Sequence, residues 1–132
     1  MHFEVRHVVP NKHYHVKFSG KITLGEVAVE LRLFSNELSE LTDSYNILWD
    51  FSEADISNLS FDTVDVIAKD VLNTMQHGKG KSAYYMDERN EKHLLNFLKQ
   101  TLDSAGFIRE IRLFHEIEQA RKYLGFPVEE TV

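Results

Sequence analysis

Four carboxylates gather around the end of one predicted buried strand: Asp50, Glu53, Asp55 and Asp62. In parallel sheets, ligands bind beyond the carboxyl ends of the strands, and carboxylate oxygens there can hold a divalent cation. Their spacing matches no calcium-binding loop, which favours an acidic, solvent-exposed loop in which Asp50 caps backbone groups. The sequence therefore predicts no metal site and leaves Asp50 and Asp55 as candidate binding residues.

Ser60 opens a predicted helix, and its hydroxyl has two interpretations. It can accept a hydrogen bond from an unsatisfied backbone N–H of the first turn, a cap that stabilises a helix by roughly 0.5–2 kcal/mol. A phosphate on the same hydroxyl would also be stabilised by the helix N-terminus. Because Asp55, Asp62 and Asp65 are close in sequence, their charge would oppose a phosphate. We therefore predict a cap and keep Ser60 as a candidate binding residue.

Three of the seven histidines lie in a predicted hairpin. His13 and His15 share one face of a strand, and His2 can approach them from the neighbouring strand. Such a set can bind zinc or nickel, but the pattern fixes neither a carboxylate nor a third ligand. Exposed hairpin histidines are therefore the favoured interpretation.

The segment 77–82 ends in Gly-Lys-Ser, like a phosphate-binding loop. Such a loop needs a further glycine where this chain has Met75, and it needs a strand before it and a helix after it. The predicted order is the reverse, which indicates a flexible basic turn. The chain also lacks a nucleophile elbow and a His-Glu-x-x-His pair, and it has no cysteine. We therefore expect a protein that is not an enzyme and has no cofactor.

Aromatic residues are concentrated in two predicted central strands, at Trp49, Phe51, Tyr84 and Tyr85. Rings on neighbouring strands usually build a core, but aromatic side chains also dominate the energetics of binding surfaces. Trp49, Tyr84 and Tyr85 therefore complete the candidate binding residues.

The composition bounds the class of protein. The 132 residues are 42% hydrophobic, which is enough for one globular domain over residues 1–132 and excludes a disordered or fibrous chain. A net charge of -6 would repel a phosphate backbone, so we expect no nucleic-acid partner. The sequence shows neither a signal peptide nor an apolar run of the ~18 residues that cross a bilayer, so we expect a cytoplasmic protein.

The spacing of apolar residues predicts nine elements in the order β-β-α-β-α-β-α-β-α. Alternation predicts a hairpin of residues 2–9 and 13–20, with Val9 opposite Tyr14 and a turn at Asn11-Lys12. The other expected elements are a helix capped by Thr23 with a stripe from Leu24 to Leu41, a strand 45–51, a helix from Ser60 to about His77, a strand 83–86, a helix between Asp87 and Gly106, a strand 107–114 and a final helix closed by Gly125.

Alternating strands and helices indicate parallel pairing with right-handed crossovers. We therefore predict an α/β fold with a single five-stranded mixed sheet and four helices, most of them on one face. Central strands that are apolar on both faces would then leave an uncovered apolar strip, a feature that usually marks an interface. We expect a symmetric homodimer, with Phe126-Pro127-Val128 folding over the strip as the alternative.

This order of elements resembles the STAS domain, the fold of bacterial anti-sigma factor antagonists. Residues 47–51, Ile-Leu-Trp-Asp-Phe, resemble the central STAS strand, and residues 118–125 resemble its final-helix signature, with an alanine before an aromatic-leucine pair. The resemblance covers nearly the whole chain. It looks closest to the stand-alone STAS and Sec14-like proteins of bacteria.

The resemblance implies a regulatory module that binds a protein partner. Regulatory STAS domains carry a phosphorylated Ser or Thr in an Asp-Ser-Ser-Gly-like turn, but the matching segment here is Asn58-Leu59-Ser60-Phe61. We therefore expect a non-enzymatic binding or regulatory module without that phosphoacceptor, whose partner is another protein or a second copy. The Sec14-like comparison implies an alternative, a carrier of a lipid or a small apolar ligand. A hydrolase using Asp50 and a histidine is a third class.

Overall fold

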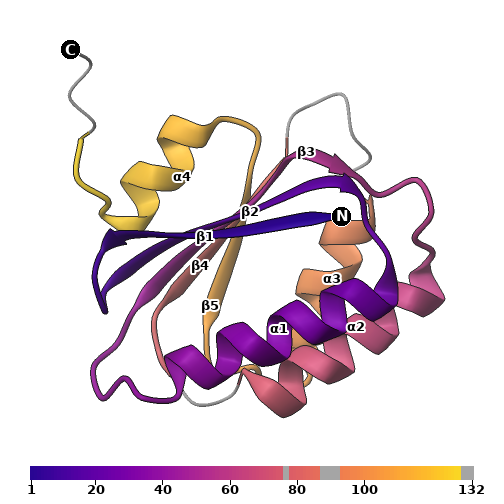
Figure 1. Cartoon of the computed structure of the whole chain (residues 1–132), viewed down its shortest axis with the longest axis horizontal. Helices are drawn as coiled ribbons and strands as arrows, with labels where there is room; N and C mark the ends of the chain where they lie inside the picture. The colour runs from indigo at the N-terminus through magenta and orange to yellow at the C-terminus, as the bar shows by residue number, and fades with distance from the viewer. Residues whose placement is uncertain (76–77, 87–92, 129–132) are drawn as a thin grey trace.

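A computed structural model describes residues 1–75, 78–86 and 93–128 of the chain (Figure 1). Its strands form one five-stranded sheet in the order β1-β2-β3-β4-β5, antiparallel between β1 and β2 and parallel elsewhere. This confirms the predicted α/β fold and the order of its elements. The elements are β1 (His2–Val9), β2 (His13–Lys21), α1 (Leu24–Leu38), β3 (Asn46–Asp55), α2 (Phe61–Thr74), β4 (Lys81–Tyr85), α3 (His93–Ser104), β5 (Glu110–Phe114) and α4 (Ile117–Leu124).

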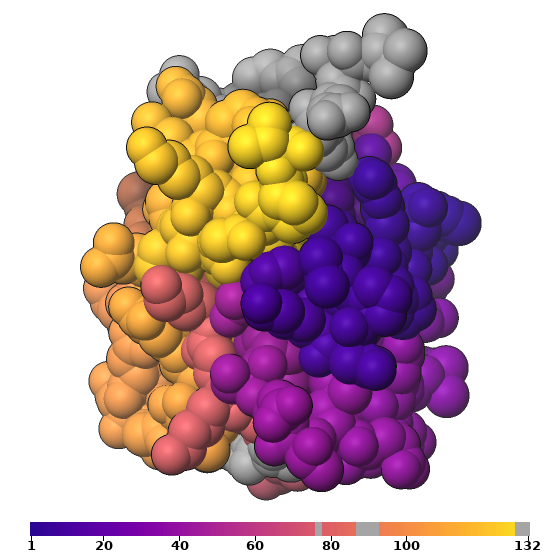
Figure 2. Space-filling model, turned by 90° about the vertical axis from the view of Figure 1, so that its left-hand side faces the viewer, coloured from indigo at the N-terminus to yellow at the C-terminus, as the bar shows by residue number. Residues whose placement is uncertain are grey.

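Helices cover both faces of the sheet: α1, α2 and α3 lie on one face and α4 lies on the other (Figure 1). Leu48 and Ala83 are fully buried beneath α4, together with Leu124 and Phe126. Figure 2 shows α4 and the segment that follows it beside the hairpin. The expected uncovered apolar strip is therefore wrong. Right-handed crossovers place the first three helices on one face, whereas α4 follows the last strand and is free of that constraint.

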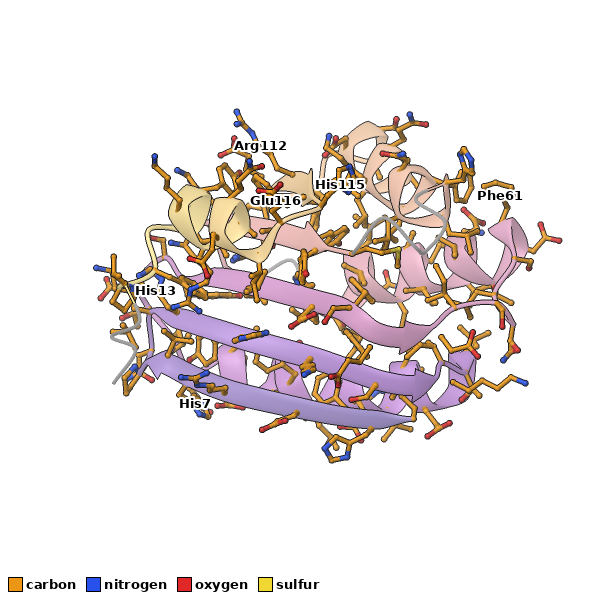
Figure 3. All side chains as sticks on the ribbon, turned by 90° about the horizontal axis from the view of Figure 1, so that it is seen from above. His7, His13, Phe61, Arg112, His115 and Glu116 are labelled. Carbon is orange, nitrogen blue, oxygen red and sulfur yellow. The ribbon has the colours of Figure 1, made fainter. Side chains whose placement is uncertain are left out.

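The hairpin keeps its predicted faces but not its predicted register. Val9 pairs with His13 rather than Tyr14, and His7 pairs with Tyr14, because the strand is irregular between His7 and Val9. The turn also includes Pro10, while Asn11 adopts a left-handed φ of 65°. Val9 is displaced by one residue, but from His7 back to Phe3 the pairing is displaced by two, so those side chains keep their predicted faces, since the period is two. Figure 3 shows the two strands side by side, with His7 and His13 near their turn.

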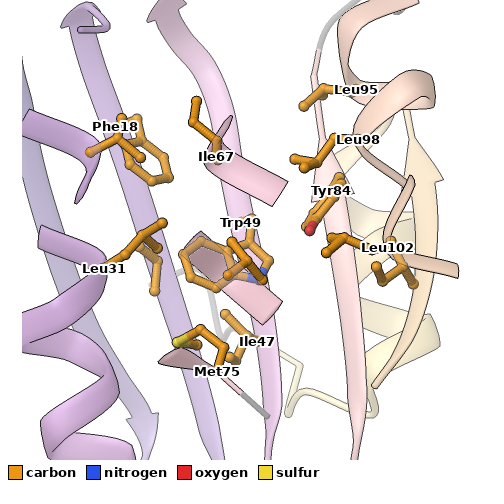
Figure 4. Close-up of a cluster of buried hydrophobic side chains, with 14 of the residues drawn as sticks. Phe18, Leu31, Ile47, Trp49, Ile67, Met75, Tyr84, Leu95, Leu98 and Leu102 are labelled. Carbon is orange, nitrogen blue, oxygen red and sulfur yellow. The ribbon is translucent and has the colours of Figure 1, made fainter. Parts of the chain in front are cut away.

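The main core lies between the sheet and the first three helices (Figure 4). Trp49 is packed edge-on against Phe34, while Phe18 and Phe51 are stacked with ring centroids 5.1 Å apart. β3 extends to Asp55, well beyond the predicted end, because its pairing with β2 continues to Lys21. Asp50 consequently lies within a buried strand and does not close it.

Several predicted boundaries also differ. The Thr23 hydroxyl donates to the Glu26 carboxylate at 2.8 Å and makes no hydrogen bond to the backbone, so the expected side-chain cap is absent from α1. β5 begins at Glu110 rather than residue 107. The helix end predicted at His77 and the helix start predicted at Asp87 lie outside the described residues.

A buried guanidinium that the sequence analysis overlooked ties the amino ends of the strands together. Arg109 is only 2% exposed, and each of its five N–H groups has an acceptor. The guanidinium also lies over the Tyr45 ring, 4.4 Å from the centroid. At 2.7–3.3 Å it donates to the hydroxyl of Ser82 and to the carbonyls of Tyr45, Gly78, Lys79 and Lys81.

Two glycines of the basic turn, Gly78 and Gly80, have a packing role beside the Arg109 guanidinium and its acceptors, which we call the Arg109 clamp. A Cβ on Gly78 would lie 2.2 Å from the Tyr45 ring, and one on Gly80 would lie 1.9 Å from the Tyr45 carbonyl oxygen. Gly80 also has a φ of 142°, which side chains rarely allow. The residues that resemble a phosphate loop therefore let the chain approach Tyr45 closely.

We predict that Arg109→Lys lowers the free energy of unfolding by about 3 kcal/mol or more, because three ammonium donors cannot serve five buried acceptors. Urea denaturation measures the change. Arg112→Lys, at a side chain that is 63% exposed, is the matched control and should stay within about 0.5 kcal/mol of wild type. Equal effects of the two substitutions would contradict the stabilising role of the Arg109 clamp.

Candidate functional site

The six candidate residues do not form one site. Trp49 pairs with Tyr84, and Asp50 pairs with Tyr85, across β3 and β4. Because successive strand residues point to opposite faces, the first pair lies under the three helices and the second pair on the α4 side. The other two candidates, Asp55 and Ser60, lie at the end of β3 and immediately before α2.

Trp49 and Tyr84 line an apolar cavity between the sheet and α1–α3, with a volume of about 70 Å³. A cavity that holds one benzene is about 150 Å³, and ligand pockets usually exceed about 300 Å³. An acyl chain would therefore require the helices to separate from the sheet. In this structure the two aromatic residues act as core residues.

Asp50 is buried in a network of hydrogen bonds on the α4 side. Its Oδ2 lies 2.8 Å from His15 Nε2, and its Oδ1 accepts from the backbone N–H of Ser52 at 2.9 Å and the Ser52 hydroxyl at 2.6 Å. Burial raises the pKa of Asp50, but the hydrogen bonds from His15 and Ser52 outweigh it and hold the pKa below its ordinary value. The backbone contact agrees with the predicted capping role, but the burial of Asp50 within β3 contradicts the expected solvent-exposed loop.

This network brings a histidine to Asp50 but does not form a nucleophilic relay. In such a relay the histidine lies between the nucleophile and the carboxylate. Here the Ser52 hydroxyl and His15 both bind Asp50, so the carboxylate lies in the middle. The arrangement stabilises a buried charge and places no histidine against the Ser52 hydroxyl.

His13 corrects the expectation of exposed hairpin histidines. Its side chain is buried, and its ring lies 4.8 Å from that of Phe126. Burial lowers the pKa of His13. The residue is covered by a segment more than a hundred positions away in the chain, which strand alternation cannot reveal. Within residues 1–75, 78–86 and 93–128, no three His, Asp or Glu side chains are grouped as a metal site.

Ser60 forms the predicted cap of α2. Its Oγ accepts from the Thr63 backbone N–H at 3.3 Å, and the Thr63 hydroxyl oxygen accepts from the Ser60 backbone N–H at 2.7 Å. Asp55 accepts from the backbone N–H and hydroxyl of Ser57, and these two bonds hold the pKa of Asp55 below its usual value. Both candidates therefore fix the turn that leads into the helix.

Phe61, the first residue of α2, is the exposed aromatic residue that the sequence analysis misplaced. Its helical spacing with Val64 and Ile67 predicts a buried position, but the side chain is 54% exposed. Its ring packs edge-on against Phe97 of α3, with centroids 5.1 Å apart. Phe61 lies in the first turn of α2, before the residues of this helix that face the sheet, which begin at Val64. Figure 3 shows it at the opposite end of the molecule from His7 and His13.

No protein-family model matches the chain, and no curated protein matches it. Among solved structures, the chain is similar to the anti-sigma factor antagonist SpoIIAA in its unphosphorylated form, with 13% identity and a TM-score of 0.47. The alignment covers 96% of this chain and 100% of that one. Among the described residues, no helix is long and apolar enough to span a membrane.

We predict that Asp50→Asn lowers the free energy of unfolding by about 1–2 kcal/mol at neutral pH. Because the pKa of Asp50 in the folded chain lies below 3.8, this difference should be complete above the ordinary pKa and shrink as the pH falls through the folded value. Urea denaturation between neutral and acid pH measures it, with the exposed Asp43→Asn as control. A difference that grows on acidification would contradict the network.

Proposed function

We propose that the chain is a non-enzymatic binding module that docks a protein partner where α2 begins. The observation that carries this proposal is Phe61, whose ring is more than half exposed and held against Phe97. Isolated exposed apolar residues are common, but this ring stands on a capped helix end. An aromatic anchor that is already positioned loses little conformational entropy on binding.

The surroundings of Phe61 indicate the chemistry of the partner. Asp55 and Asp62 are exposed, and the partly exposed Asp65 forms an ion pair with Lys69. A complementary surface would offer an apolar pocket for the ring, with Lys or Arg side chains at its rim. The net charge of -6 would also attract such a basic surface over a distance.

Two further features support partner binding without catalysis or a phosphoserine switch. The hydroxyl of Ser52 binds the Asp50 carboxylate rather than a histidine, and the Ser60 hydroxyl is engaged in the helix cap. Leu59 stands where the STAS resemblance places the phosphorylated residue, and leucine has no hydroxyl to modify. Docking would therefore depend on the aromatic anchor and its carboxylates.

We predict that Phe61→Ala raises the dissociation constant of the natural partner at least about tenfold, because it removes a central aromatic anchor. Affinity capture from the cells that make the protein, followed by mass spectrometry, identifies proteins retained by wild type and lost from the variant. Titration with the purified partner then measures the dissociation constant.

Two variants serve as controls. Val29→Ala removes a side chain that is 56% exposed on α1, and it should retain the partner. Ser60→Ala should lower the free energy of unfolding by about 1 kcal/mol and also retain the partner. Retention by Phe61→Ala, or loss with Ser60→Ala alone, would contradict the proposed surface.

A further inference from the structure

The outer edge of β1 is a second surface suited to binding. β1 is an eight-residue strand at the end of the sheet, and among the described strands it pairs with β2 alone. Such an edge presents a row of backbone N–H and C=O groups that another strand can satisfy. β5, the strand at the opposite edge, has only five residues. Figure 1 shows β1 along the near edge of the sheet, above α1.

The side chains of β1 differ between its two faces. Phe3 and Val5 pack partly against the main core on the helix side. Glu4 and Arg6 are exposed on the other face, where Glu4 lies opposite Lys17 of β2 and Arg6 opposite His15. One side of the strand is therefore apolar, and the other carries two opposite charges two positions apart.

We propose that β1 pairs antiparallel with β1 of a second copy, about a two-fold axis through Val5. This register places Glu4 opposite Arg6 of the second copy, and the symmetry repeats the pair in the other direction. On the helix side, Val5 meets its own counterpart and Phe3 meets His7 of the second copy. The two five-stranded sheets become one continuous sheet.

The charges on β1 favour this register over the two registers whose axes pass through Glu4 or Arg6. An axis through Glu4 would place two glutamates directly opposite each other, and an axis through Arg6 would place two arginines opposite each other. Like charges in directly opposed positions destabilise strand pairing, whereas opposite charges stabilise it. The axis through Val5 also continues the row of alternating charge that begins with Lys17 and Glu4 inside each copy. This homodimer does not need the apolar strip that α4 covers, and it is independent of the Phe61 surface.

Charge reversal tests the register. Sedimentation equilibrium at low ionic strength, up to millimolar protein, should show a dimer of the wild-type chain that weakens as salt screens the ion pairs. Glu4→Arg and Arg6→Glu should each raise the dimer dissociation constant at least about tenfold, because each turns both ion pairs into repulsions. Arg32→Glu, at an exposed position on α1, is the matched control and should not change it.

Two recombinations distinguish the proposed pairing from a loss of folding. The double variant E4R/R6E should dimerise like wild type, because the charges are exchanged and remain complementary. An equimolar mixture of the two single variants should form the heterodimer, which native mass spectrometry resolves from the homodimers. A monomeric wild type at millimolar concentration would overturn the proposal. So would single variants that dimerise normally, or a mixture that fails to restore the dimer.

Discussion

The buried guanidinium of Arg109 is the interaction on which the arrangement of the parallel strands depends. Its acceptors come from the residue before β3, from the turn before β4 and from β4 itself. Burial lowers the pKa of Arg109, opposed by the neighbouring Tyr45 and Tyr84, and four carbonyl oxygens take the place of a carboxylate partner. Removing one group from such a buried set leaves the other polar groups without hydrogen-bond partners, which lowers the free energy of unfolding. The residues at the amino ends of the parallel strands therefore serve to hold the fold together.

The residues on the two faces of the sheet also serve to hold the fold together. The three crossover helices cover one face and leave a cavity too small for an acyl chain. α4 and Phe126 cover the apolar residues of the other face, where Asp50 is held by His15 and Ser52. The surfaces that are left for binding a partner lie at the start of α2 and along the edge of β1. The first offers an aromatic ring among carboxylates, and the second offers backbone groups with self-complementary charges.

The sequence predicts well those features that depend on local pattern. The apolar residues at 47–49, the Ser60 cap and the left-handed Gly125, with its φ of 73°, all appear where the spacing places them. The predicted hairpin register is wrong because the turn also includes Pro10 and the strand is irregular before Val9, and together these displace the pairing by two residues. Contacts between distant segments, such as His13 with Phe126, leave no trace in periodicity.

The position of Arg109 in the sequence predicts that it is buried. It shares a face with Phe107 and Ile111 in the alternating segment, so its position predicts burial although its charge predicts exposure. Phe61 is the opposite case, an apolar residue at helical spacing that lies beyond the sheet. In both, the position relative to the neighbouring elements decides the burial, and the residue type alone misleads.

Native mass spectrometry of the protein purified from the cells that make it, under conditions that preserve non-covalent ligands, tests the central claim most directly. The claim is that the interior is packed for stability and recognition occurs at the surface. We predict the mass of the bare 15.4 kDa chain or its multiples, with any additional mass belonging to a protein. A stoichiometric acyl or lipid species that is released on denaturation would contradict this account and favour a carrier.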